Sequence, residues 1–175
     1  KKNSKFSYDF ESLQYQNSFN GYRHNFNGST ATKTSSIDAK ASFLKNKSTT
    51  RKGNFLKANL VIKHNFKKSW IGGIIDTEDN KQTDIETKKL NLLNQKYLSY
   101  GGFLGIGDTT KVYAKLGVDI RHNDSVQNNK LTRVNNSRSY HIKSSLVQHK
   151  NAQVGAYINY RTVENIFQEN TNALN

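Results

Sequence analysis

The chain of 175 residues contains no cysteine, no proline and no methionine. Without cysteine, a disulfide scaffold, a thiol nucleophile and a thiolate metal site are all excluded. Proline lacks the backbone N–H that a central strand donates to its neighbour, so its absence agrees with continuous strand pairing. The chain also lacks any apolar run near the ~20 residues that a transmembrane helix needs. These absences favour a β-protein that is stabilised by pairing and packing alone.

Apolar side chains are scarce as well. Hydrophobic residues make up 34% of the chain, charged residues 23% and aromatic residues 11%, whereas a soluble domain is usually about 45–50% apolar. This composition suits a single domain, residues 1–175, whose apolar side chains all lie on one face. The net charge of +14 permits nucleic acid, an acidic polymer or lipid phosphates as partners, and a lysine-rich solvated surface explains it equally well.

The clearest element is the stretch from Lys111 to Arg121, in which apolar and polar residues alternate strictly. Successive side chains of a strand point to opposite faces, so the alternation predicts a two-sided strand and excludes an amphipathic helix. The nine residues from Val112 to Ile120 match the ~9–11 residues with which a tilted strand crosses a bilayer. We therefore interpret this stretch as one strand of a membrane barrel.

Similar alternation recurs along the chain and predicts an all-β, antiparallel up-and-down meander of about eight strands. The further strands are expected at 33–44, 54–66, 70–76, 88–107, 140–149 and 154–161, with weaker alternation over 6–15 and 19–26, and a polar tail over 164–175. Asn27-Gly28 predicts a type I′ turn, because both residues tolerate positive φ.

The connections between these strands alternate in length. Short ones are expected at 27–32, 67–69, 107–110 and 149–151, and long polar ones at 45–53, 77–87 and 122–138. Up-and-down membrane barrels carry short turns at one rim and long loops at the other. The pattern therefore predicts a transmembrane β-barrel or part of one.

The two faces of the expected strands differ in chemistry. The positions expected to face lipid are Leu56, Leu60, Ile62, Val112, Leu116, Val118, Ile120, Ile142, Leu146, Val154 and Ile158. Those expected to face a wet lumen are Lys57, Lys63, Lys115, Asp119, Arg121, Lys143 and Arg161. Phe66, Trp70, Tyr140 and Tyr160 are candidates for the aromatic girdles at the membrane interfaces. The basic lumen favours an anionic ligand or acidic chain segments. An equal alternative is that these basic side chains neutralise partner strands or a plug that is not part of this chain.

Nothing in the sequence supports catalysis. The five histidines are not spaced as zinc ligands, and the glycine-rich stretch from Gly101 to Lys111 leads into a strand, whereas a phosphate-binding loop leads into a helix. No nucleophile, base and orienting group come together in the pattern. We expect a non-enzymatic protein without a cofactor or a metal.

The region 95–164 resembles the large outer-membrane β-barrel proteins of Bacteroidota, including the giant barrels of the type IX secretion translocon kind. The resemblance lies in the run from Tyr97 to Gly107, the stretch Val112-Tyr113-Ala114-Lys115-Leu116-Gly117 that follows the next turn, and Asn123-Asp124-Ser125-Val126. It implies a bacterial outer-membrane location, with outer-membrane lipid and other barrel segments or protein subunits as partners. It also implies O-glycosylation at Ser125 and Thr109, which follow aspartates in the pattern typical of that phylum.

Two functional hypotheses follow from the sequence. The first is a non-enzymatic outer-membrane barrel that serves transport, secretion or surface anchoring. Because small barrels of this kind usually end in an aromatic residue and this chain ends Asn172-Ala173-Leu174-Asn175, we expect a segment of a larger barrel. The second is a soluble antiparallel sheet that binds a polyanion through its lysines, with affinity that falls steeply with salt. Nucleic acid is not an expected partner under the first hypothesis.

Overall fold

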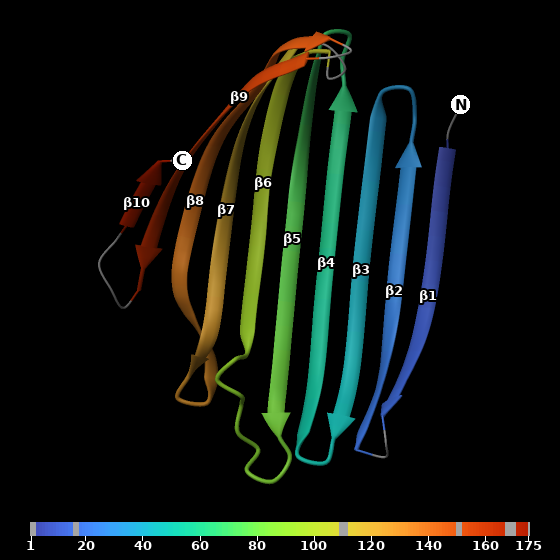
Figure 1. Ribbon diagram of the computed structural model, residues 1–175, viewed down its shortest axis with the longest axis vertical. Helices are drawn as coiled ribbons and strands as arrows, with labels where there is room; N and C mark the ends of the chain where they lie inside the picture. The colour runs from blue at the N-terminus through green and yellow to red at the C-terminus, as the bar shows by residue number, and fades with distance from the viewer. Residues whose placement is uncertain (1–2, 16–17, 109–111, 150–151, 167–170, 175) are drawn as a thin grey trace.

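The computed structural model describes residues 3–15, 18–108, 112–149, 152–166 and 171–174. In these residues ten antiparallel strands follow one another in chain order through one sheet (Figure 1). The strands are β1 (Asn3–Tyr15), β2 (Phe19–Ala31), β3 (Ser35–Ser48), β4 (Arg51–Asn65), β5 (Ser69–Asp84), β6 (Gln95–Gly107), β7 (Tyr113–Gln127), β8 (Lys130–His149), β9 (Ala152–Asn165) and β10 (Thr171–Leu174). The predicted all-β, up-and-down antiparallel architecture is therefore confirmed.

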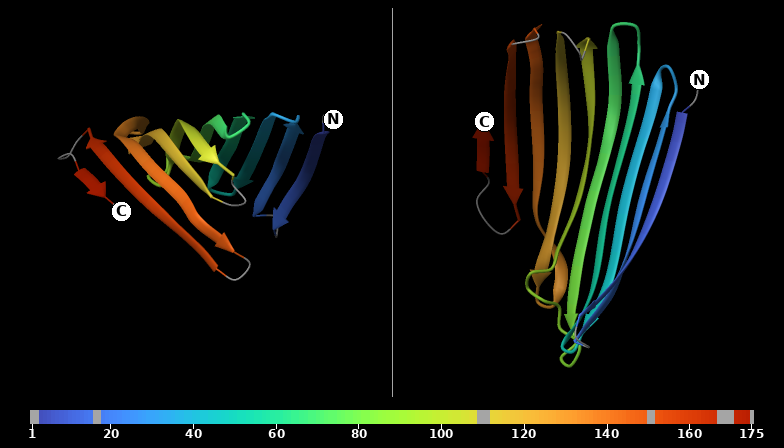
Figure 2. Two further views of the ribbon diagram at one scale, coloured as in Figure 1. Left: turned by 90° about the horizontal axis from the view of Figure 1, so that it is seen from above. Right: turned by 45° about the vertical axis from the view of Figure 1, so that its right-hand side comes forward.

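The sheet is a single curved layer, and no other described part of the chain covers either face (Figure 2). Within the described residues it is open, because β1 pairs only with β2 and β10 pairs only with β9. Trp70 is the only large apolar side chain in the described part of the chain that is buried. The described residues include no helix that could span a membrane. The usual compact core of a globular domain is thus replaced by two exposed faces.

The expected strand number of about eight is too low. Nine strands contain 13–20 residues each, and the short β10 adds four residues in the stretch expected to be a polar tail. Main-chain pairing with β9, in which Ala173 lies opposite Arg161, requires no apolar side chain. A polar sequence can therefore join the sheet although no alternating pattern in the sequence predicts a strand there.

The prediction of long loops at 45–53 and 122–138 is wrong. Strands run through both stretches, and only residues 49–50 and 128–129 connect them. Asn128 and Asn129 have φ of 48° and 61°, which is the geometry of a two-residue type I′ hairpin. Polar partners across the strands, such as Asn123 and Asn135 at 2.7 Å, stabilise the extended ladder. The polar stretches still gather at one rim, but as strand ends.

Three other boundaries differ from the sequence-based expectation. Asn27 and Gly28 lie inside β2 and not in a turn, and the chain reverses at residues 32–34, where the Thr32 hydroxyl accepts hydrogen bonds from the backbone N–H groups of Thr34 and Ser35. The expected loop 77–87 is mostly β5, which continues to Asp84. The strand expected over 88–107 begins only at residue 95, and residues 85–94 form the longest connection between fully described ends.

Candidate functional site: the two faces of the sheet

The strand register aligns the apolar side chains of nine strands on one face of the sheet. Partner residues that lie directly opposite share a face, and the printed partners link Tyr8 through Phe26, Ala41, Ala58, Thr77 and Leu98 to His122. We call this surface the apolar face. Its apolar members are Phe6, Tyr8, Phe10, Tyr22, Phe26, Ile37, Ala39, Ala41, Phe43, Leu56, Ala58, Leu60, Ile62, Ile71, Ile75, Leu98, Tyr100, Leu104, Ile106, Ala114, Leu116, Val118, Ile120, Tyr140, Ile142, Val154, Ala156, Ile158 and Tyr160.

The apolar face is exposed along its whole width. Leu116 on β7 is 47% exposed, and its direct partners Leu104 and Ile142 are 51% and 46% exposed. Eight inter-strand steps of about 4.8 Å, and an apolar stretch of about seven residues at about 3.3 Å each, define a band of order 800 Å². The largest apolar patch on a soluble monomer is typically about 300–600 Å². This face therefore requires an apolar environment or a covering layer.

The apolar band crosses the strands obliquely. The ladder row that contains Tyr8, at the centre of the apolar stretch of β1, reaches Leu98 on β6 and Glu164 on β9. The apolar stretch of β9 is instead centred between Ala156 and Ile158, about seven residues from Glu164. The band therefore shifts by about 23 Å along the strands while it crosses about 38 Å of the sheet from β1 to β9. The corresponding tilt of about 30° is near the ~35–45° tilt of strands in membrane barrels.

All seven residues predicted to face a lumen lie on the opposite face, which we call the polar face. Lys115 and Lys143 are direct partners on β7 and β8. Lys115 Nζ lies 4.1 Å from the ring centre of Phe103, and Lys63 Nζ lies 5.3 Å from that of Trp70. Aromatic faces thus contact two of these cations on the same surface.

The polar face also carries carboxylates of β5, at the end of the strand expected over 70–76 and in the connection expected after it. Glu78 lies 3.5 Å from Lys57 Nζ, and the Tyr97 hydroxyl donates a hydrogen bond of 2.8 Å to Asp76. The Arg121 guanidinium lies 3.8 Å from the centre of the Tyr97 ring. Trp70, Gly72 and Ile74 alternate along β5 on the polar face, and Asp76 and Glu78 continue the same alternation. Following the alternation beyond the last apolar residue would therefore have assigned both carboxylates to this face.

The other described contacts of the polar face are also between strands. His141 Nδ1 on β8 lies 3.3 Å from the Asp119 carboxylate on β7, and the Arg161 guanidinium donates a hydrogen bond of 3.3 Å to the buried Ser137 hydroxyl. Basic side chains therefore outnumber acidic ones among the predicted residues, and part of the charge is paired. Among the described residues of the polar face, no group is arranged as a nucleophile with a base.

Trp70 does not lie where an aromatic girdle would. It is on the polar face, only 6% exposed, directly opposite Gly105 of β6. A Cβ on Gly105 would collide with the Trp70 ring, so the glycine provides the space that buries the indole. Tyr140 and Tyr160, by contrast, are direct partners on the apolar face, with ring centres 6.4 Å apart.

For four of the residues singled out in the sequence, the structure gives either a different position from the expected one or no description of the side chain. Val112 precedes β7 and lies in the connection from β6. Leu146 lies at a register shift between Ser145 and Val147, and its side chain is outside the described set. Thr109 also lies outside the described residues. Ser125 is half-buried within β7, opposite Thr132, and not in a loop.

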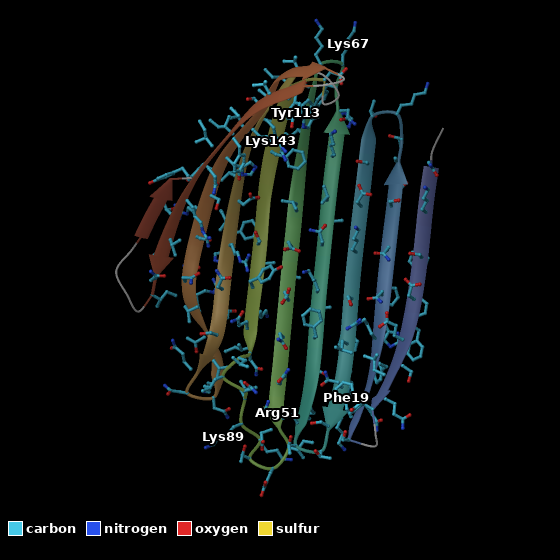
Figure 3. All side chains as sticks on the ribbon, viewed as in Figure 1. Phe19, Arg51, Lys67, Lys89, Tyr113 and Lys143 are labelled. Atoms are coloured by element: carbon cyan, nitrogen blue, oxygen red, sulfur yellow. The ribbon has the colours of Figure 1, made fainter. Side chains whose placement is uncertain are left out.

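The connection 85–94 folds back onto β5 at the rim beyond the apolar band. The buried Asn94 side chain accepts a hydrogen bond from the Gln82 N–H and donates one to the Gln82 carbonyl, both of 2.7 Å. The Thr87 backbone N–H and hydroxyl hold the pKa of the Asp84 carboxyl below its usual value. Arg51 and Lys89 mark this rim, and Lys67 marks the opposite one (Figure 3).

In the part of the chain that the structure describes, no group of three or more His, Asp or Glu side chains could hold a metal ion. Comparisons with protein-family models, curated proteins and solved structures returned no match to the chain.

Proposed function

We propose that this chain is a transmembrane β-barrel protein of the bacterial outer membrane, or a segment of one, with lipid against the apolar face and water against the polar face. The observation that carries the proposal is the continuous, exposed apolar band that crosses nine strands obliquely. In water such a band would drive aggregation. In a bilayer it is satisfied by lipid, and its height of about 20–25 Å is near the ~25 Å band of known outer-membrane barrels.

The barrel would be completed at the two free edges of the sheet. Unpaired edge strands expose rows of N–H and C=O groups that template further pairing, and closure is the arrangement that removes them. In the described residues one edge is β1 and the other is β9 with the short β10. Nine long strands are enough to form a small barrel, and pairing of these edges with further strands would give a larger one. Both arrangements place the polar face around a lumen.

The proposed role is transport, secretion or surface anchoring without catalysis. Lys63, Lys115 and Lys143 lie near one another on the polar face, and basic side chains in a lumen favour anions. We expect a reconstituted pore to prefer chloride over potassium, measured as the reversal potential under a salt gradient in a planar bilayer. Reversal of the three charges to glutamate should invert this preference, and a wild-type pore that prefers cations would contradict the basic-lumen assignment.

Two simple measurements test the membrane assignment itself. The protein should need detergent to stay monodisperse, and an unheated sample should migrate differently from a boiled one on a denaturing gel, because closed or paired strands resist detergent unfolding. A monomer that is fully soluble in plain buffer would refute the proposal. That result would favour the alternative of a soluble sheet that binds a polyanion, whose affinity should fall steeply as salt rises.

A further inference from the structure

Four lysines continue the apolar face beyond its band, at the rim that carries the turn 49–50. Lys45 and Lys47 lie on β3, Lys52 on β4 and Lys81 on β5, and all four are exposed. All four share the face of Phe43. Lys45 and Lys47 are two and four residues from Phe43 on β3, Lys52 lies opposite Lys47, and Lys81 lies opposite Asn54, which is itself the partner of Lys45. We call this set the lysine patch.

No carboxylate lies on the ladder rows that contain the patch. One row is Ser12, Tyr22, Lys45, Asn54 and Lys81, and the next is Gln14, Asn20, Lys47, Lys52 and Thr83. Among the described residues, none of the four lysines takes part in an ion pair. The polar face of the same strands does contain such a pair, Lys57 on β4 with Glu78 on β5 at 3.5 Å. On the next row toward the apolar band, Asp79 lies opposite Lys96, so the four patch lysines leave an excess of positive charge on the side that faces away from the proposed lumen.

Lys47 and Lys52 are direct cross-strand partners, an arrangement in which like charges destabilise a sheet. An anion bound between them would remove this repulsion. A hollow of about 510 Å³ lies at this corner and is lined by Lys45, Lys47 and Lys52, with Phe10 and Tyr22 on its wall. The hollow thus combines cationic groups with aromatic surface that is continuous with the apolar band.

We propose that the lysine patch binds the phosphate groups of membrane lipid headgroups, an assignment that rests on the proposed function. Along β3, Lys45 lies about 7 Å and Lys47 about 13 Å beyond Phe43, and strand tilt shortens both distances along the membrane normal. The headgroup region extends about 5–8 Å beyond each side of the hydrocarbon core. The lysines therefore stand at the depth of lipid phosphates, and the aromatic wall accommodates the apolar part of a lipid, which free phosphate lacks.

The test compares lipid binding by two variants that lose the same charge. The first, Lys45→Gln with Lys47→Gln and Lys52→Gln, removes three lysines of the patch. The matched control, Lys33→Gln with Lys67→Gln and Lys68→Gln, removes three lysines from turns at the opposite rim. Binding of phosphatidylglycerol and of phosphatidylcholine to the full chain in neutral detergent is measured by native mass spectrometry as a function of lipid concentration.

Near an anionic surface each lysine changes affinity roughly fivefold, so the patch variant should bind phosphatidylglycerol about 100-fold more weakly, and added salt should reduce the difference. The control variant should bind as the wild type does, and phosphatidylcholine affinity should stay the same in all three proteins. Equal losses in both variants, or no saturable phosphatidylglycerol binding, would overturn the proposal. Complete displacement of the lipid by inorganic phosphate at matched ionic strength would instead identify a free-anion site and overturn the lipid assignment.

Different results would refute the lipid-binding role of the lysine patch and the membrane assignment. Insertion into vesicles of pure phosphatidylcholine without any preference for phosphatidylglycerol would overturn the lysine patch and leave the proposed function standing. A chain that remains a soluble monomer with these vesicles present would overturn both.

Discussion

Substitution of Leu116 by lysine should lower the free energy of unfolding much more if the apolar face contacts lipid than if it contacts water. Leu116 lies near the centre of the apolar stretch of β7, with Leu104 and Ile142 directly opposite on the neighbouring strands. A lysine on the lipid face at the bilayer midplane costs about 2–4 kcal/mol, which is a change of roughly 30- to 700-fold in the folding equilibrium. On a solvated sheet the same half-exposed position should change stability by less than about 0.5 kcal/mol.

Two matched substitutions control for effects other than lipid contact. Ser139→Lys adds the same side chain to the polar face of β8, opposite Asp119 and Arg161, and should cost less than about 1 kcal/mol because the lysine stays in water beside a carboxylate. Leu56→Lys lies on the apolar face at its border, opposite Asp79, and should cost about 0–1 kcal/mol. Leu116→Lys at the midplane should therefore cost more than either control.

The assay is equilibrium urea unfolding of the protein in phosphatidylcholine vesicles, followed by fluorescence of Trp70, the single tryptophan, and by circular dichroism. Free energies of unfolding are compared among the wild type and the three variants. If Leu116→Lys and Ser139→Lys cost the same within about 0.5 kcal/mol, the apolar face does not contact lipid and the argument for a membrane protein is refuted.

Two further experiments test the packing of the polar face. Gly105→Ala should destabilise by about 1–3 kcal/mol in the same unfolding assay, because the added methyl group collides with the Trp70 ring; Gly102→Ala, whose new Cβ would lie 3.6 Å from its nearest neighbour, should be much better tolerated, and equal costs would contradict this account. A double-mutant cycle of Tyr97→Leu with Arg121→Gln should give a coupling of about 0.5–1 kcal/mol, since the guanidinium lies over the Tyr97 ring. A coupling of zero would mean that the contact contributes nothing to stability.

Much of the two-faced design could be predicted from residues close together in the sequence. Alternation along Ala114, Leu116, Val118 and Ile120 is a local signal, because successive side chains of any strand must point to opposite faces. The same rule assigned Lys115 and Arg121 to the other face before any neighbour was known. It failed where alternating apolar residues stop, as in the stretch from Thr77 to Asp84, which was read as a loop.

The sequence by itself determined that the chain forms strands and which side chains share a face within each strand. Only the tertiary structure decided how far each strand runs, which carboxylates join the polar face, and how the apolar stretches align from β1 to β9. The physical reason is that a ladder is held by backbone hydrogen bonds between segments far apart in the chain, so polar strands pair as readily as apolar ones. The oblique path of the apolar band exists only in that register, and no single strand carries it.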